Sequence, residues 1–84
     1  MIENLVLDAK LQEHMPEGVK LRTQFDPDCD RLEVHVRYRD KTGRLVHYVV
    51  PFDTTTGYTI EQVAEVTRHV AHIDGPLARF EALQ

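Results

Sequence analysis

The spacing of apolar and polar positions changes twice along the chain. Apolar residues recur at helical spacing near the N-terminus, alternate with a period of two over the middle of the chain, and return to helical spacing after Thr59. Helical spacing places side chains on one face of a helix, and alternation places them on one face of a strand. The pattern predicts a helix at 2–13, strands at 19–25, 31–39 and 44–52, a helix at 60–74 and a short C-terminal tail at 76–84.

The predicted first helix has two apolar sides. One stripe at helical spacing, which we expect to face the core, consists of Ile2, Leu5, Val6 and Ala9. Leu7 and Leu11 fall on the opposite side of this helix, at about 100° per residue. We therefore expect Leu7 and Leu11 to form a second apolar surface that a partner could cover.

The second and third strands form a hairpin whose register follows from its turn. Lys41-Thr42-Gly43 has the length of a three-residue loop, with Gly43 at the left-handed position of a bulge. Placing Asp40 opposite Arg44 then puts the apolar residues of both strands on one face, whereas a slip of one residue would not. The predicted pairs are Tyr38–Val46, Val36–Tyr48, Val34–Val50 and Leu32–Phe52.

The first hairpin turns at Asp26-Pro27-Asp28-Cys29, which has the Asp and Pro of a type I turn. Pairing Phe25 with Asp30 sets Arg22 opposite Glu33, an attractive cross-strand pair. The alternative register sets Lys20 opposite Arg37, which is a pair of like charges. We therefore expect the register with Arg22 opposite Glu33.

The last helix has the clearest boundaries. Thr59 and Gln62 have the spacing of a capping box, and Asp74-Gly75-Pro76 supplies a glycine cap and a proline after the helix. Its expected buried stripe is Ile60, Val63, Ala64, Thr67, Val70 and Ala71. With one apolar and one polar sheet face, both helices should pack on the same side, which predicts a single α+β domain over 1–84, a two-layer sandwich in α-β-β-β-α order with a three-stranded antiparallel meander.

Composition narrows the class of protein. The chain has 84 residues, a net charge of −4 and 42% hydrophobic residues, which suits one small globular domain. It has no apolar run long enough to span a membrane and no export signal, so we expect a soluble cytoplasmic protein with no membrane partner. Cys29, its one cysteine, lies between Asp28 and Asp30, where a reactive thiolate is disfavoured.

Metal and catalytic chemistry find little support in the sequence. Asp26, Asp28 and Asp30 open like a calcium loop, but Arg31 and Arg37 stand where that loop needs glycine and glutamate. Two of the five histidines, His35 and His47, should lie near each other on the polar sheet face, without a third ligand or a carboxylate partner. The chain has no serine, and an open sheet face offers no pocket for a general base. We therefore expect no enzyme activity, no cofactor and no metal.

Charge on the polar sheet face is the most unusual feature. Four basic side chains face Glu33 alone, although the whole chain is acidic. Such segregation favours an anionic partner, while the simpler alternative is that an exposed sheet face is polar in any case. Leu45 and Val49 on this face favour a protein partner. The candidate binding residues are Lys20, Arg22, His35, Arg37, Arg39 and His47.

Nucleic acid is a weaker candidate for the anion. The element order is also that of double-stranded RNA-binding domains, a resemblance of topology alone. That family places a lysine cluster at the start of its second helix, where this chain has Glu61 and no lysine. Base stacking would need aromatic rings on the open face, but those of the strands are expected on the buried face: Phe25, Tyr38, Tyr48 and Phe52.

We therefore expect a small non-catalytic protein-interaction module, an adaptor or regulatory protein that also self-associates. The apolar surface expected to form the oligomer interface is Leu7, Leu11, Leu77, Phe80 and Leu83. The alternative function is an anion-binding module that contacts nucleic acid or an acidic protein through its basic sheet face.

Overall fold

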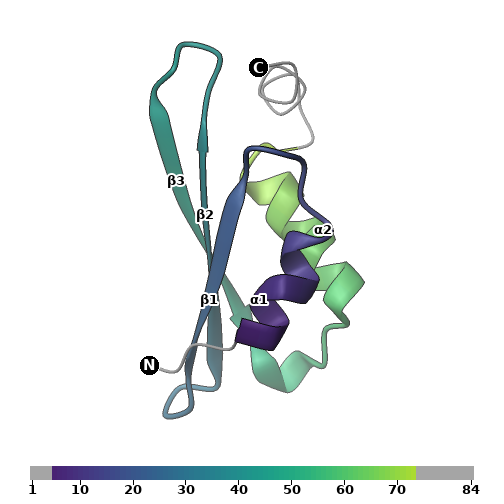
Figure 1. The fold of residues 1–84 in the computed structure, drawn as a ribbon. Helices are drawn as coiled ribbons and strands as arrows, with labels where there is room; N and C mark the ends of the chain where they lie inside the picture. The colour runs from purple at the N-terminus through teal and green to yellow at the C-terminus, as the bar shows by residue number, and fades with distance from the viewer. Residues whose placement is uncertain (1–4, 74–84) are drawn as a thin grey trace.

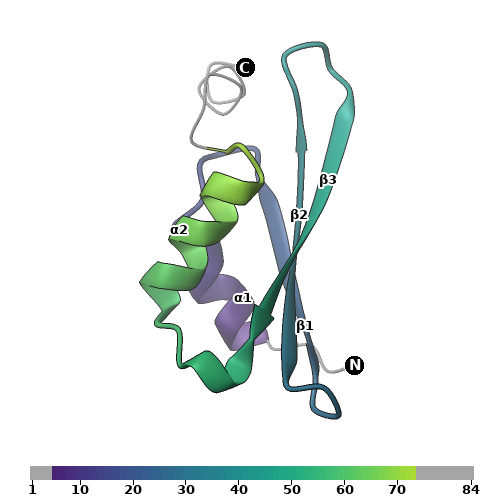
Figure 2. The ribbon, with the colours of Figure 1, turned by 180° about the vertical axis from the view of Figure 1, so that it is seen from behind.

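The computed structural model describes residues 5–73 and places two helices on one face of an antiparallel sheet (Figures 1 and 2). The strands lie in the order β1-β2-β3, so the sheet is the expected meander. The structure confirms the α-β-β-β-α sandwich. Among the described residues, no helix is long and apolar enough to cross a membrane. The elements are α1 (Leu5–Gln12), β1 (Lys20–Asp26), β2 (Arg31–Arg39), β3 (Leu45–Asp53), the short 3-10 helix η1 (Thr54–Thr56) and α2 (Ile60–Val70).

The β2–β3 hairpin has the predicted register. The N–H of Asp40 donates to the carbonyl of Arg44 at 3.0 Å, and Gly43 adopts the left-handed conformation with φ +83°. The Asp40 carboxylate also accepts the N–H groups of Thr42 and Arg44, which fixes the loop. The tip of this hairpin projects past β1 and the helices (Figure 1). All the expected pairs are present: Tyr38–Val46, Val36–Tyr48, Val34–Val50 and Leu32–Phe52.

The β1–β2 register differs from the prediction by two residues. Lys20 lies opposite Arg37, and Arg22 lies opposite His35 instead of Glu33. The alternative that sets like charges across the sheet is therefore the one that forms.

The turn between β1 and β2 explains this register. Asp26 pairs with Arg31, so residues 27–30 form the connection. The Asp26 side chain accepts the N–H of Asp28 at 3.0 Å, its carbonyl accepts that of Cys29 at 3.3 Å, and Asp30 adopts φ +49°. The Asp30 carbonyl also accepts the N–H of Thr54 at 2.9 Å. Several local hydrogen bonds outweigh one surface charge pair, which is worth about 1 kcal/mol at most.

The buried side of α1 is the reverse of the prediction. Leu11 is 0% exposed in the core and Leu7 packs against the core, whereas Leu5 and Val6 are 75% and 67% exposed. The expected core stripe is therefore wrong, and Leu11 has no surface to offer an oligomer interface.

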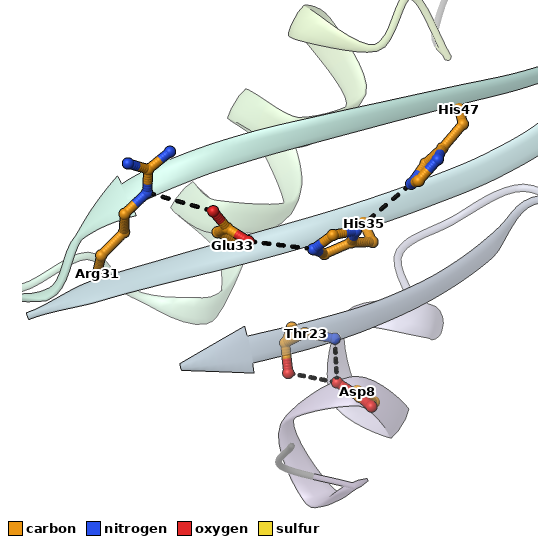
Figure 3. Close-up of polar contacts among 6 residues, drawn as sticks. All are labelled: Asp8, Thr23, Arg31, Glu33, His35 and His47. Carbon is orange, nitrogen blue, oxygen red and sulfur yellow. Dashed lines mark hydrogen bonds and ion pairs between the residues drawn. The ribbon is translucent and has the colours of Figure 1, made fainter. Parts of the chain in front are cut away.

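Polar side chains of α1 determine this orientation by bonding the outer edge of β1. The Gln12 amide donates to the carbonyl of Val19 at 2.7 Å and accepts the N–H of Leu21 at 3.1 Å. One turn earlier, Asp8 accepts the N–H of Thr23 at 2.8 Å and also its hydroxyl (Figure 3). Three backbone groups that a neighbouring strand would bond are thus satisfied by two side chains of a helix: the carbonyl of Val19 and the N–H groups of Leu21 and Thr23.

The N-terminus of α2 has the predicted capping box. The Thr59 hydroxyl accepts the N–H of Gln62 at 3.1 Å, and the Gln62 side chain accepts the N–H of Thr59 at 2.9 Å. Val63, Ala64 and Thr67 are buried as expected, while Val70 is 44% exposed.

The C-terminus of α2 comes earlier than predicted. The helix ends at Val70, and His72 rather than Gly75 takes the left-handed position, with φ +58°. The N–H of Ile73 donates to the carbonyl of Arg68 at 2.8 Å, and Ile73 is fully buried. This is a Schellman-type ending, in which burial of the following apolar residue holds a non-glycine residue at positive φ. Gly75 and the predicted tail at 76–84 lie outside the described residues.

The core lies between the sheet and the helices. The hydroxyl of Tyr38 donates to the carbonyl of Ala71 at 2.8 Å and so joins β2 to the end of α2. The other fully or nearly buried apolar residues are Leu11, Val19, Val34, Val36, Val50, Phe52, Val63, Ala64 and Ile73.

Candidate functional site

The sheet face away from the helices carries the candidate binding residues in two rows across the strands. Lys20, Arg37 and His47 form one row, and Arg22, His35 and Val49 form the next. Arg39 lies one row beyond, opposite Leu45. We call this surface the basic face, and its members are Lys20, Arg22, His35, Arg37, Arg39 and His47.

The two rows enclose a hollow of about 150 Å³. The expectation that this face offers no pocket is therefore wrong. The hollow is smaller than a typical small-molecule pocket. Its lining residues are Lys20, Leu21, Arg22, His35, Arg37 and His47, so five of the six predicted binding residues come together.

Arg39 is the predicted binding residue that this hollow does not include. It lines a neighbouring depression of about 260 Å³ together with Lys20 and Arg37. Leu45, 56% exposed, also lines this depression. The neighbouring depression thus combines basic and apolar groups.

Like charges face each other at the hollow. Lys20 and Arg37 are direct cross-strand neighbours, an arrangement that costs stability unless a counter-charge is near. Within residues 5–73, neither side chain has a carboxylate within ion-pair distance. The acidic residue nearest in register, Glu33, instead contacts Arg31 at 3.5 Å and His35 at 3.3 Å.

Four side chains of β2 and β3 form a polar chain along the basic face (Figure 3). Arg31 Nε lies 3.5 Å from Glu33 Oε2, and Glu33 Oε1 lies 3.3 Å from His35 Nε2. His35 Nδ1 is then 3.4 Å from His47 Nε2. If His35 donates to Glu33, its Nδ1 accepts the Nε2–H of His47, so donation runs from His47 through His35 to Glu33. The predicted proximity of the two histidines is correct, but their expected lack of a carboxylate partner is wrong.

Sequence reasoning placed Glu33 on this face but missed its contact with His35. The expected register used it to neutralise Arg22, whereas in the structure it orients His35. The sequence feature that could have indicated this contact is the position of Glu33 two residues before His35, which places both side chains on the same face of β2.

The described residues do not assemble a metal cluster of three or more His, Cys, Asp or Glu side chains. The residues lining the hollow also include no hydroxyl or thiol nucleophile. The cationic side chains of the hollow supply positive charge and N–H donors, which suit an anion.

Cys29 lies at the opposite end of the sheet, in the exposed β1–β2 turn. The negative charge of Asp26, followed by a hydrogen bond to its carboxylate, raises the pKa of the Cys29 thiol. A raised pKa reduces the thiolate fraction, so this cysteine is a poor nucleophile.

The expected oligomer interface does not form one surface in the described structure. Leu11 is buried and Leu7 is half-buried, while Leu77, Phe80 and Leu83 lie outside the described residues. The exposed apolar residues next to the basic face are instead Leu45 and Val49, 56% and 43% exposed.

No protein-family model matches the chain, and no curated protein or solved structure was found to be similar to it.

Proposed function

We propose that this protein is a small non-catalytic interaction module whose basic face binds an acidic segment of a partner protein. The observation that carries the proposal is the direct opposition of Lys20 and Arg37 over a hollow without a counter-charge among the described residues. A carboxylate in this hollow would offset the repulsion between the two side chains. Binding would thus place a negative charge beside Lys20 and Arg37.

Apolar neighbours favour a protein over nucleic acid as the source of the anion. Leu45 and Val49 offer contacts that a phosphate backbone cannot use. The stacking platforms of single-strand binders need aromatic rings on the exposed sheet face, but Tyr38 and Phe52 are buried in the core.

A glutamate peptide tests the proposal. We expect a fluorescein-labelled peptide of eight glutamates to bind, with an affinity that falls as salt rises. Lys20→Glu combined with Arg37→Glu should weaken binding by about tenfold or more, because attraction becomes repulsion at the hollow. The measurement is fluorescence anisotropy at several salt concentrations.

Lys10→Glu combined with Lys41→Glu is the matched control, because it makes the same change in charge at exposed positions on α1 and the hairpin tip. Equal weakening by both double variants would show a response to net charge and overturn the proposed site. Tighter binding of a single-stranded oligonucleotide than of the peptide would favour nucleic acid instead.

A further inference from the structure

The two edges of the sheet differ in how their backbone groups are satisfied. At the outer edge of β1, Asp8 and Gln12 bond the backbone at Val19, Leu21 and Thr23. No comparable side chain among residues 5–73 bonds the outer edge of β3. Helix α1 therefore occupies one edge of the sheet beside Val19, Leu21 and Thr23, while no side chain of residues 5–73 bonds the backbone along the other edge, where a strand could be added.

The hydrogen-bonding pattern identifies the backbone N–H and C=O groups of β3 that point away from β2. Asp40 and Arg44 form a bonded pair, and bonded and non-bonded pairs alternate along an antiparallel ladder. Leu45, His47 and Val49 therefore direct their N–H and C=O groups outward. The same alternation directs the groups of Val19, Leu21 and Thr23 outward along the outer edge of β1, where α1 side chains bond the carbonyl of Val19 and the N–H groups of Leu21 and Thr23.

Pro51 limits the length of the open edge. It occupies the next outward position and has no N–H to donate. The segment available to an added strand, which we call the β3 edge, is Leu45–Val50.

The two sides of the β3 edge differ in chemistry. On the basic face, Leu45, His47 and Val49 are exposed, with Arg39 and Arg37 in the next strand. On the helix side, Val46 and Tyr48 are only partly buried against the core. An added strand would therefore place one set of alternate side chains beside positive charge and the other set beside apolar surface.

We propose that the acidic partner binds as an additional β-strand on the β3 edge, with acidic residues alternating with β-branched apolar residues. This inference rests on the proposed function and specifies the conformation and sequence class of the partner. Backbone hydrogen bonds to Leu45, His47 and Val49 hold the strand, and its acidic side chains face the row of His47 and Arg37. Its apolar side chains cover Val46 and Tyr48.

Charge distinguishes this partner from a second copy of the chain. Pairing two β3 edges would place two basic faces side by side, with Arg37 and Arg39 repeated in each copy. An acidic strand would place negative charge beside Arg37 and Arg39, whereas a second copy would bring more positive charge there.

Two peptides with the same composition but a different residue order test whether acidic and apolar residues must alternate. We expect an eight-residue peptide of alternating glutamate and valine to bind at least about tenfold more tightly than one with the order Glu-Glu-Val-Val repeated. Only the first can place all its acidic groups on one side of a strand. In two further versions of the alternating peptide, every second amide is N-methylated. One version is blocked along one edge of the extended peptide, and the other version is blocked along the opposite edge. We expect one to bind and the other to lose binding, because a single peptide edge pairs with β3.

A protein variant tests the β3 edge. Val49→Pro removes one outward N–H at a position of the same parity as Pro51, so the ladder to β2 is retained. It should weaken binding of the alternating peptide by about tenfold, while Val49→Thr, which keeps the N–H, should have little effect. Circular dichroism checks that both variants fold.

The outcomes separate this inference from the proposed function. If the Lys20 and Arg37 variant weakens binding while Val49→Pro and both N-methyl peptides bind normally, the basic face is the site and the added strand is overturned. If Val49→Pro weakens binding and the charge variant does not, the edge binds a strand and the acidic partner is overturned. Dimerisation abolished by Val49→Pro in sedimentation measurements would identify a second copy as the occupant and overturn the acidic strand.

Discussion

At the scale of single residues, Asp40 shows how one side chain sets the geometry of a hairpin. Its carboxylate accepts the hydroxyl of Thr42 at 2.6 Å and the N–H groups of Thr42 and Arg44. The hydrogen bond from the Thr42 hydroxyl is the main cause that lowers the pKa of Asp40. The folded state therefore favours the charged carboxylate.

This lowered pKa predicts a loss of stability in acid. Because the pKa of Asp40 is lower in the folded than in the unfolded chain, the unfolded chain binds more protons as the pH falls from about 5 through the folded pKa. The stabilisation is complete above the unfolded pKa and is lost across that window. Asp40→Asn removes this contribution, so its urea midpoint should fall less with acidification than that of the unmodified chain. Parallel pH profiles would contradict the prediction.

Thr67 shows the opposite case, a polar group whose burial destabilises the fold. Its hydroxyl is fully buried and has no hydrogen-bond partner among the described residues. Thr67→Val removes that desolvation penalty with little change in shape, so we expect the free energy of unfolding to rise by about 1 kcal/mol. Thr23→Val is the control, because the Thr23 hydroxyl donates to Asp8 and its loss should destabilise. Urea denaturation of both variants provides the measurement, and a less stable Thr67→Val would refute this account.

At the scale of elements, α1 is joined to β1 by two polar side chains, Asp8 and Gln12, as well as by its buried leucines. Gln12→Ala would leave the carbonyl of Val19 and the N–H of Leu21 without their partner. The expected loss is about 1–3 kcal/mol in the free energy of unfolding, measured in urea. Gln12→Glu keeps the acceptor for Leu21 but loses the donor to Val19, and its stability should be intermediate. If Gln12→Ala is as stable as the unmodified chain, the edge contacts contribute nothing.

Sequence reasoning succeeded where local and periodic signals agreed. Gly43, Asp40 and the alternation of β2 and β3 all indicate one register, and that register forms. At the β1–β2 hairpin the predicted register depended on one charge pair. The structure has a different register, which the hydrogen bonds within residues 26–30 and the bond from Thr54 of η1 to Asp30 stabilise. The bonds from Thr54 to the carbonyl of Asp30 join residues that are distant in sequence, so the turn residues alone could not reveal them.

The reversed face of α1 has a similar cause. This helix has apolar residues on both sides, so periodicity does not define its buried face. The deciding residues, Asp8 and Gln12, look like ordinary solvent-exposed positions in the sequence. Their role appears only when the edge of β1 lies beside them.

At the scale of the whole molecule, the charge is distributed unevenly. The chain carries −4, yet one broad face of a molecule measuring 39 × 21 × 20 Å presents the cations of β1 and β2. An uneven distribution of this kind orients a charged partner before contact and raises the rate of association. The candidate residues of this face could be predicted because alternation alone assigns them to it. The hollow and the contact of Glu33 with His35 depended on the true register and so could not.

The asymmetry between the two sheet edges also bears on how far strand addition could extend this sheet. A sheet that can be extended at both edges is able to grow without end, because each added chain offers a new site for the next. Here Asp8 and Gln12 of α1 terminate one edge, so addition of a strand to β3 uses the remaining site. If a partner strand binds at β3 as proposed, we expect a stoichiometry of one strand per chain and discrete complexes instead of filaments.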